Sequence, residues 1–175
     1  MPEALTPRAR QIVETAREIL EDEGLDALTM RRIAERLGIR APSLYTHFPD
    51  KSALEAAIIS AGFEEQAAVF EQAVDGSADP LTDLAGAYRS FARAHPHLYR
   101  LMTDQELRRD LLAPGVEERA GRTIYDAAGQ DADRARAAWA FAHGMTLLEL
   151  TNRFPPGADI DAAWREGIRA FAAGR

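Results

Sequence analysis

Apolar residues recur every three or four positions along most of the chain, which is the spacing of helices that bury one face. The pattern predicts helices over residues 7–23, 30–37, 41–46, 51–74, 80–94, 97–102, 116–128, 131–152 and 158–173. No run alternates apolar and polar residues over the length of a strand. We therefore expect an all-α fold of about nine helices.

Cap and turn residues divide this pattern near the amino end of the chain. Thr29 is suited to cap a helix, Gly38 ends that helix, and the fixed φ of Pro42 suits the first turn of the next one. Two helices of this length are marginal alone in water, so they need the first helix to pack against. The arrangement predicts an N-terminal three-helix helix-turn-helix head over residues 1–50 and a C-terminal antiparallel helical bundle over residues 51–175.

The charge of the chain is unevenly distributed. The 175 residues include 21 Lys or Arg and 28 Asp or Glu, so the net charge is −7. Residues 29–51 differ from the rest, because their five basic residues outnumber two acidic ones. An acidic body with a small basic region argues against coating nucleic acid non-specifically and favours local contact with a polyanion.

Several classes of function are unsupported by the sequence. The absence of cysteine excludes disulfides, thiolate zinc sites and cysteine nucleophiles. No Ser-His-Asp order, glycine-rich phosphate loop or paired catalytic carboxylate stands out. The pair His95-x-His97 is weak evidence for a metal site, because no carboxylate cluster neighbours it in the sequence. We expect no catalytic residues, no metal and no cofactor. With no secretory signal and no stretch of about 18 apolar residues, we also expect no membrane association and a cytoplasmic protein.

The residues around the third helix divide into an inward and an outward set. Ile33, Leu44 and Phe48 fall on the side that faces the first helix. The outward set comprises Arg40, Ala41, Pro42, Ser43, Tyr45, Thr46 and His47. Small residues at positions 41–43 allow close approach to base edges in a major groove. This outward set therefore predicts a helix that contacts DNA.

Five positions, two of them in the outward set, are candidates to bind the phosphate backbone. Tyr45, His47 and Lys51 continue from the third helix into the next cap and can donate hydrogen bonds to phosphate oxygens. Thr29 lies at a helix N-terminus, whose free N–H groups attract phosphate. Arg31 is a further candidate, although its side chain could equally belong to an ordinary solvated face.

These residues carry a resemblance to a known family. The run Thr29-Met30-Arg31-Arg32-Ile33-Ala34-Glu35-Arg36-Leu37-Gly38, then Ala41-Pro42-Ser43-Leu44-Tyr45-Thr46-His47-Phe48 and Lys51, resembles the N-terminal DNA-binding module of TetR-type regulators. The resemblance covers about residues 8–58. It is specific, because a generic helix-turn-helix does not require the ending Tyr45-x-His47-Phe48 followed by Lys51. Arg40 departs from the pattern, because the family usually has Ser or Thr capping the recognition helix. An arginine there could reach a guanine edge or a phosphate.

The resemblance implies a homodimer. In the family, helices eight and nine of two subunits form a four-helix bundle, and the two heads bind half-sites of an inverted repeat. The sequence agrees with this implication, because the helix over residues 131–152 is apolar on more than one side and so needs a second partner. The candidate interface residues are Trp139, Leu147, Leu150, Trp164, Ile168 and Phe171.

The resemblance also implies a ligand-sensing half, in which helices four to eight surround a cavity. His95-Pro96-His97-Leu98-Tyr99-Arg100-Leu101-Met102 and Trp139-Ala140-Phe141-Ala142-His143-Gly144 occur where one subgroup has similar runs. The candidate pocket residues are Phe63, Phe70, Tyr88, Phe91, His95, Tyr99, Met102, Tyr125, Phe141, His143 and Met145. They predict a small apolar or aromatic effector held by a few polar anchors. Core packing alone would also explain each of them.

Together these features predict a ligand-responsive, sequence-specific transcriptional regulator, a repressor that binds a double-stranded DNA operator as a dimer. One alternative is a small-molecule-binding all-α protein or enzyme that uses the C-terminal cavity without binding DNA. That alternative leaves the N-terminal module unexplained. A second alternative is a dimeric adaptor that has lost DNA binding, against which Tyr45, His47 and Lys51 argue.

Overall fold

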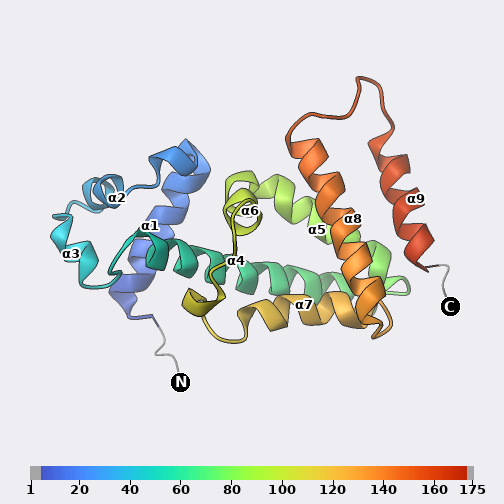
Figure 1. The fold of residues 1–175 in the computed structure, drawn as a ribbon, viewed down its shortest axis with the longest axis horizontal. Helices are drawn as coiled ribbons and strands as arrows, with labels where there is room; N and C mark the ends of the chain where they lie inside the picture. The colour runs from blue at the N-terminus through green and yellow to red at the C-terminus, as the bar shows by residue number, and fades with distance from the viewer. Residues whose placement is uncertain (1–4, 173–175) are drawn as a thin grey trace. The chain divides into compact units, whose positions relative to one another are not determined.

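The computed structural model describes residues 5–172, which form nine α-helices and two short 3₁₀ helices and contain no strand (Figure 1). The α-helices are α1 (Pro7–Glu23), α2 (Met30–Arg36), α3 (Pro42–Tyr45), α4 (Lys51–Val74), α5 (Pro80–Ala94), α6 (Pro96–Thr103), α7 (Val116–Ala127), α8 (Ala132–Leu150) and α9 (Ile160–Ala172). This confirms the all-α prediction. The 3₁₀ helices, Leu25–Ala27 and Arg109–Leu111, were not predicted. None of the described helices is long and apolar enough to cross a bilayer.

Side-chain caps set the helix starts that the sequence predicts. The Thr29 hydroxyl oxygen accepts the backbone N–H of Arg32 at 3.1 Å, at the start of α2. A carboxylate oxygen of Asp50 accepts the N–H of Ala53 at 2.8 Å, at the start of α4. Each cap satisfies a backbone donor that has no partner inside the helix. Gly24, with φ of +83°, ends α1 as expected.

Two helices in the C-terminal half are shorter than predicted. Helix α8 ends at Leu150 rather than Asn152, because Asn152 adopts a left-handed φ of +52° that cannot continue a helix. Helix α9 begins at Ile160 rather than 158, because the Asp159 carboxylate accepts the N–H of Ala162 at 2.8 Å and so caps the helix. Both ends follow from local backbone chemistry that periodicity does not report.

The chain divides into two compact units. The first unit contains the described residues up to 63 together with 95–117, and the second contains 64–94 together with the described residues from 118 onward. The two family-like domains predicted over 1–50 and 51–175 remain a prediction, because compactness alone does not define a functional domain.

The first unit is organised around α1, which contacts α2 and α6. A carboxylate oxygen of Glu21 accepts the backbone N–H of Leu98 at 3.1 Å, which ties the start of α6 to α1. The largest fully buried side chains of this unit are Ile12, Ile19, Leu20, Leu28, Ile33, Leu44, Leu54, Ile58, Leu98 and Tyr99. The short helices α2 and α3 are therefore stabilised by packing rather than by their own hydrogen bonds.

The second unit packs α5 against both α8 and α9, and α8 and α9 lie side by side (Figure 1). The ring of Phe141 on α8 occupies the place where a side chain at Gly167 on α9 would begin, so the two helices approach closely there. Phe141 also contacts Trp164 and Phe171, with ring centroids 5.7 and 5.8 Å away. These aromatic contacts hold α9 against α8.

A partly buried ion-pair network also joins these three helices. The Arg89 guanidinium on α5 donates two hydrogen bonds to Glu149 on α8, at 3.1 and 2.9 Å, and one to Asp161 on α9 at 2.6 Å. The indole N–H of Trp164 donates to the other oxygen of Glu149 at 2.5 Å, and Arg89 lies 5.6 Å from the Trp164 ring centroid. Desolvation alone would lower the pKa of Arg89, but the hydrogen bonds that it donates to Glu149 and Asp161 outweigh this and raise the pKa, so the guanidinium stays charged. The sequence pattern alone does not predict this network.

Candidate functional site

Helix α3 and the three residues after it, positions 42–48, divide into buried and exposed side chains. Leu44 and Phe48 are 0% and 4% exposed, whereas Tyr45 is 50% exposed. Pro42 and Ser43 are exposed at the start of the helix. The inward set is buried as predicted, and the outward set is exposed except for the half-buried Ala41, so α3 presents a protruding surface rather than a packed one.

The turn before α3 is a helix-ending motif built on glycine. Gly38 has φ of +65°, and its N–H donates to the carbonyl of Glu35 at 3.1 Å. The N–H of Ile39 donates to the carbonyl of Ala34 at 3.0 Å. This pair of bonds is the Schellman pattern, which satisfies the last carbonyls of α2 and turns the chain sharply. The turn places α3 across the end of α2.

No side-chain hydrogen bond caps the start of α3. The carbonyl of Arg40 accepts the N–H of Ser43 at 2.9 Å, and the carbonyl of Ala41 accepts that of Leu44 at 3.0 Å. The Arg40 side chain is exposed, and within residues 5–172 no hydrogen bond or ion pair holds it. Replacing the family's usual Ser or Thr therefore leaves a free guanidinium beside α3.

The other cations near α3 differ in how firmly they are held. Arg32 and Arg36 both bind the carboxylate of Glu23, at 2.8 and 2.9 Å, and the Arg32 hydrogen bonds lower the pKa of Glu23. Arg31, whose side chain is 88% exposed, pairs only with Glu35 one turn away. Such an exposed pair is weak and easily exchanged for a phosphate. Arg32 and Arg36 hold α2 to the end of α1, whereas Arg31 remains accessible.

The remaining predicted contact residues also lie on the exposed side. Thr29, Tyr45, His47 and Lys51 are exposed, and Ala41 is half-buried. The Lys51 ammonium is 3.2 Å from the carboxylate of Glu55.

Thr46 is less suited to donate a hydrogen bond to a phosphate, because its hydroxyl already donates to the carbonyl of Ser43 at 2.8 Å. Donation to a phosphate would require that hydrogen bond to break. By contrast, Thr29 accepts a hydrogen bond with its oxygen and retains its own proton for donation.

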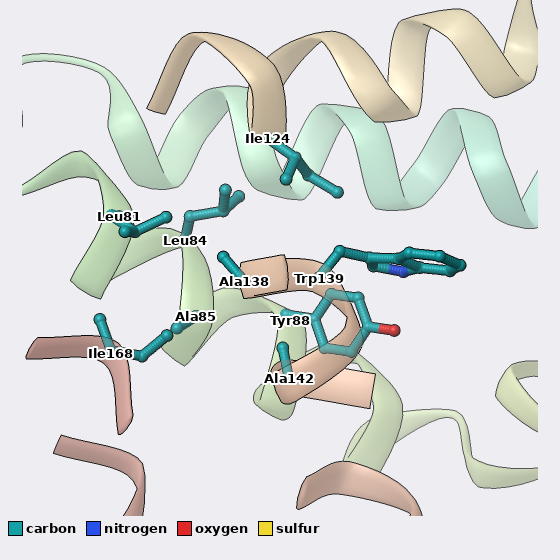
Figure 2. A pocket seen from close by; sticks show the side chains of 9 residues that line it. All are labelled: Leu81, Leu84, Ala85, Tyr88, Ile124, Ala138, Trp139, Ala142 and Ile168. Atoms are coloured by element: carbon teal, nitrogen blue, oxygen red, sulfur yellow. The ribbon is translucent and has the colours of Figure 1, made fainter. Parts of the chain in front are cut away.

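The second unit contains an apolar cavity of about 290 Å³, a volume that includes space open to solvent (Figure 2). It is lined by Leu81, Leu84, Ala85, Tyr88, Ile124, Ala138, Trp139, Ala142 and Ile168. None of these side chains is charged. Figure 2 shows the Tyr88 ring and the Trp139 indole at one end of the cavity, where they bring a hydroxyl group and an indole N–H.

Most residues predicted for an effector pocket do not line this cavity. Tyr88 does, and Phe70, which does not line the cavity, stacks on Tyr88 with ring centroids 5.8 Å apart. Phe141 packs into the contact between α8 and α9, and Tyr125 is exposed. Phe91 and Met145 are buried in the second unit, and His143 stacks on Trp139 at 6.2 Å. Four others belong to the first unit: Phe63, His95, Tyr99 and Met102.

The residues predicted for a dimer interface also separate. Trp164 and Ile168 are 6% and 4% exposed in a single protomer, so they have little surface left to offer a partner. Leu147, Leu150 and Phe171 are half-buried. Trp139 is 49% exposed, and Leu148, which is also on α8 and was not among the predicted interface residues, is 41% exposed.

The described residues contain no group of three or more His, Asp or Glu side chains arranged to hold a metal ion. The Nδ1 atom of His95 lies 3.9 Å from the Glu21 carboxylate, at the start of α6. His97 lies beside Gly24 at the end of α1. Both histidines therefore lie where α6 meets α1.

Two family models match the chain. Residues 12–58 match the model for bacterial regulatory proteins of the tetR family, and residues 81–171 match the model for a tetracyclin repressor-like C-terminal domain. An uncharacterized HTH-type transcriptional regulator of Mycobacterium tuberculosis, Rv0681, is 31% identical, and the alignment covers 93% of this chain and 79% of that protein.

Solved structures agree with these matches. A protein of unknown function from Rhodococcus sp. RHA1 superimposes with a TM-score of 0.74 at 27% identity, covering 97% of this chain and 95% of that one. A TetR variant of Acinetobacter baumannii in complex with minocycline gives a TM-score of 0.65 at 27% identity, covering 94% of both chains.

Proposed function

The chain belongs to the TetR family of bacterial transcriptional regulators. From this premise we propose that it binds an inverted-repeat operator as a homodimer and represses transcription. We propose further that a small apolar effector lowers its affinity for the operator. The family consists of ligand-responsive DNA-binding regulators rather than enzymes. The proposal concerns the residues of this chain that bind DNA, the partner subunit and the effector.

The exposed surface of α3 carries the DNA-binding part of the proposal. Ala41, Pro42 and Ser43 offer little bulk, so the start of α3 can approach base edges in the major groove. Tyr45 and Lys51 then donate to phosphates on one side, and Thr29 and Arg31 do so from α2. One observation supports operator binding best. The start of α3 is small and exposed, hydrogen-bond donors surround it, and Leu44 and Phe48 are buried beneath it.

Arg40 is proposed to read a base. Its side chain is exposed, has no hydrogen-bond or ion-pair partner among residues 5–172, and lies next to the small residues that would enter the groove. A guanidinium can donate two parallel hydrogen bonds to a guanine edge, which is the commonest specific contact in major grooves. His47 and Thr46 have secondary roles in this scheme, because Thr46 must first give up its hydrogen bond to Ser43.

The exposed apolar residues of α8 support dimerisation. Leu148 and the exposed part of Trp139 would be covered by a second copy, with Leu147 and Leu150 at the edge of the contact. Two-fold symmetry of the operator complex would require two recognition helices about one DNA turn apart, roughly 34 Å, or slightly more. That spacing predicts an operator with inverted half-sites.

The apolar cavity of the second unit is the proposed effector site. Its lining suits a neutral hydrocarbon or aromatic group, with Tyr88 and Trp139 as polar anchors. A related TetR variant binds minocycline, which supports a small-molecule ligand of this general kind. Binding would favour a dimer geometry that no longer fits adjacent major grooves, so operator affinity would fall by a population shift.

Selection of bound fragments from random DNA tests the proposal. We expect an inverted repeat that binds with a strong salt dependence. Lys51→Gln should lower the slope of log affinity against log salt by about two, because the dimer loses one phosphate contact at each of its two half-sites. Arg122→Gln, at an exposed position of α7, is the matched control and should leave the slope unchanged. Recovery of no preferred sequence would refute operator binding.

A further inference from the structure

A separate cavity of about 490 Å³, including space open to solvent, lies in the first unit. It is lined by Ser52, Glu55, Ala56, Ile59, Leu101, Met102, Gln105, Glu106, Leu107, Arg108 and Leu112. These residues come from the first two turns of α4, the end of α6 and the segment that follows α6. This site is distinct from the apolar cavity of the second unit, and Met102 is the one residue that it shares with the predicted effector pocket.

The segment after α6 is fixed over α4 by hydrogen bonds. The hydroxyl of Ser60, a buried residue of α4, accepts the backbone N–H of Ala113 at 3.0 Å and donates to the carbonyl of Ala56 at 2.7 Å. At the other end, the close packing of α4 and α6 positions Met102, because a Cβ atom at Gly62 would lie 2.8 Å from its sulfur. The cavity is therefore enclosed by anchored backbone on two sides.

The lining is amphipathic. Ile59, Leu101, Met102 and Leu112 provide apolar surface, whereas Glu55 and Glu106 provide carboxylates. Arg108 is the one lining cation, and Asp110 already holds its guanidinium with two hydrogen bonds at 3.0 and 2.8 Å.

The charges near the cavity have an acidic excess. Four acidic side chains, Asp50, Glu55, Glu106 and Asp110, act on this region against the two cations Lys51 and Arg108. A ligand with an apolar body and a positive end would meet both parts of the lining.

We propose that this cavity is a second small-molecule site, which takes an amphipathic cation and strengthens DNA binding. Its apolar body lies against Ile59 and Met102, and its ammonium group pairs with Glu55. The carboxylate of Glu55 already holds the Lys51 ammonium at 3.2 Å. A ligand cation that competes for Glu55 frees Lys51 for a phosphate.

The cation should therefore raise the affinity of the protein for DNA, whereas the apolar effector lowers it. Freeing Lys51 and adding a positive charge beside it both favour a polyanion. By linkage, DNA must increase the affinity for the cation by the same factor. This part of the inference rests on the proposed function, whereas occupation of the cavity does not.

Calorimetry with phenethylamine and two isosteres tests occupation of the cavity. We expect phenethylamine to bind at least tenfold more tightly than phenethyl alcohol or phenylacetate. Ile59→Trp should abolish binding by filling the cavity, whereas Gln72→Trp, at an exposed position of the same helix, should not. Glu55→Gln should reduce the affinity for the amine to that for the alcohol. Equal binding of the three probes, or unchanged binding to the Ile59→Trp protein, would overturn the proposal.

Fluorescence anisotropy with the selected operator tests the coupling. At constant ionic strength, saturating phenethylamine should lower the Kd of wild-type protein for DNA several-fold. Glu55→Gln should lower that Kd without the amine and remove its further effect. Weaker or unchanged DNA binding with the amine would overturn the coupling. Absence of any DNA binding would instead refute the proposed function, and the calorimetric result would still decide whether the cavity is a site.

A second variant guards against misfolding of the Ile59→Trp protein. Leu112→Trp fills the same cavity from the segment after α6, where Leu112 is half-buried. It should also abolish amine binding, and its circular dichroism and thermal unfolding should match those of wild-type protein. Amine binding retained in a folded Leu112→Trp protein would contradict the assignment.

Discussion

The proposed DNA-contact surface and the apolar cavity of the second unit are built in different ways. The contact surface comes from residues 29–51, which are continuous in sequence. The cavity takes residues from α5, α7, α8 and α9, between Leu81 and Ile168. Every residue predicted for the contact surface except the half-buried Ala41 is exposed there. Of the residues predicted for the pocket, Tyr88 alone lines the cavity.

The difference shows which physical information a local sequence carries. The contact surface is shaped by a cap at Thr29 and a glycine turn at Gly38, both of which act within a few residues. The cavity is the space left after four helices pack, and its volume depends on every side chain that meets there. Aromatic residues therefore predict a packed interior in general, but not which part of it is empty.

The largest expected effect comes from truncating the core under the contact surface. Leu44→Ala should lower the unfolding free energy by about 3–4 kcal/mol, because Leu44 is fully buried and a cavity would remain. Tyr45→Ala, one position away, should change it by no more than about 0.5 kcal/mol. Urea unfolding measures both. Similar losses for the two variants would contradict the division of α3 into a buried and an exposed side.

The stability of the second unit should depend instead on contacts between helices that are far apart in the sequence. Glu149→Ala should cost about 2–3 kcal/mol, because it leaves Arg89 and the indole N–H of Trp164 without their shared acceptor. Glu166→Ala is the control, since Glu166 makes only an exposed pair with Arg169 one turn away and should change stability little. Thermal unfolding of the two variants compares the loss of the Glu149 network with the loss of the exposed Glu166 pair. Equal melting temperatures would exclude a stabilising role for the network.

The same contrast explains how far the sequence predicts the structure. Periodicity, caps and proline positions predict all nine α-helices of the described chain, and the errors lie at ends such as Asn152, where a left-handed residue intervenes. Arg89 and Glu149 were not recognised, because they are 60 positions apart and each resembles an ordinary surface charge on its own helix. Trp164 and Ile168 have the spacing of an interface stripe, yet they are buried within one protomer, because α9 must first pack on α5 and α8.

DNA binding should respond differently to two substitutions on the contact surface. Tyr45→Phe removes one hydroxyl donor to phosphate, so it should weaken binding to all sequences by about 1 kcal/mol, or roughly fivefold. Arg40→Ala should relax the preference at a single base position while affecting other positions little. Anisotropy with a set of single-substituted operators measures both effects. A uniform loss for Arg40→Ala would assign that side chain to the phosphate backbone.

The smallest effect concerns the ion pairs that keep Arg32 and Arg36 away from the contact surface. Hydrogen bonds from these arginines lower the pKa of Glu23 below its ordinary value of 4.5, so its carboxylate stabilises the folded head above that pH. The contribution is lost as the pH falls through the lowered pKa, because the folded protein must then take up the proton. Glu23→Gln should therefore be less stable than wild-type protein at pH 7, and the two should converge in strong acid. Urea midpoints of the two proteins, measured across this pH range, test whether the stability difference shrinks as the pH falls. A difference that does not change with pH would mean that Glu23 acts through its shape rather than its charge.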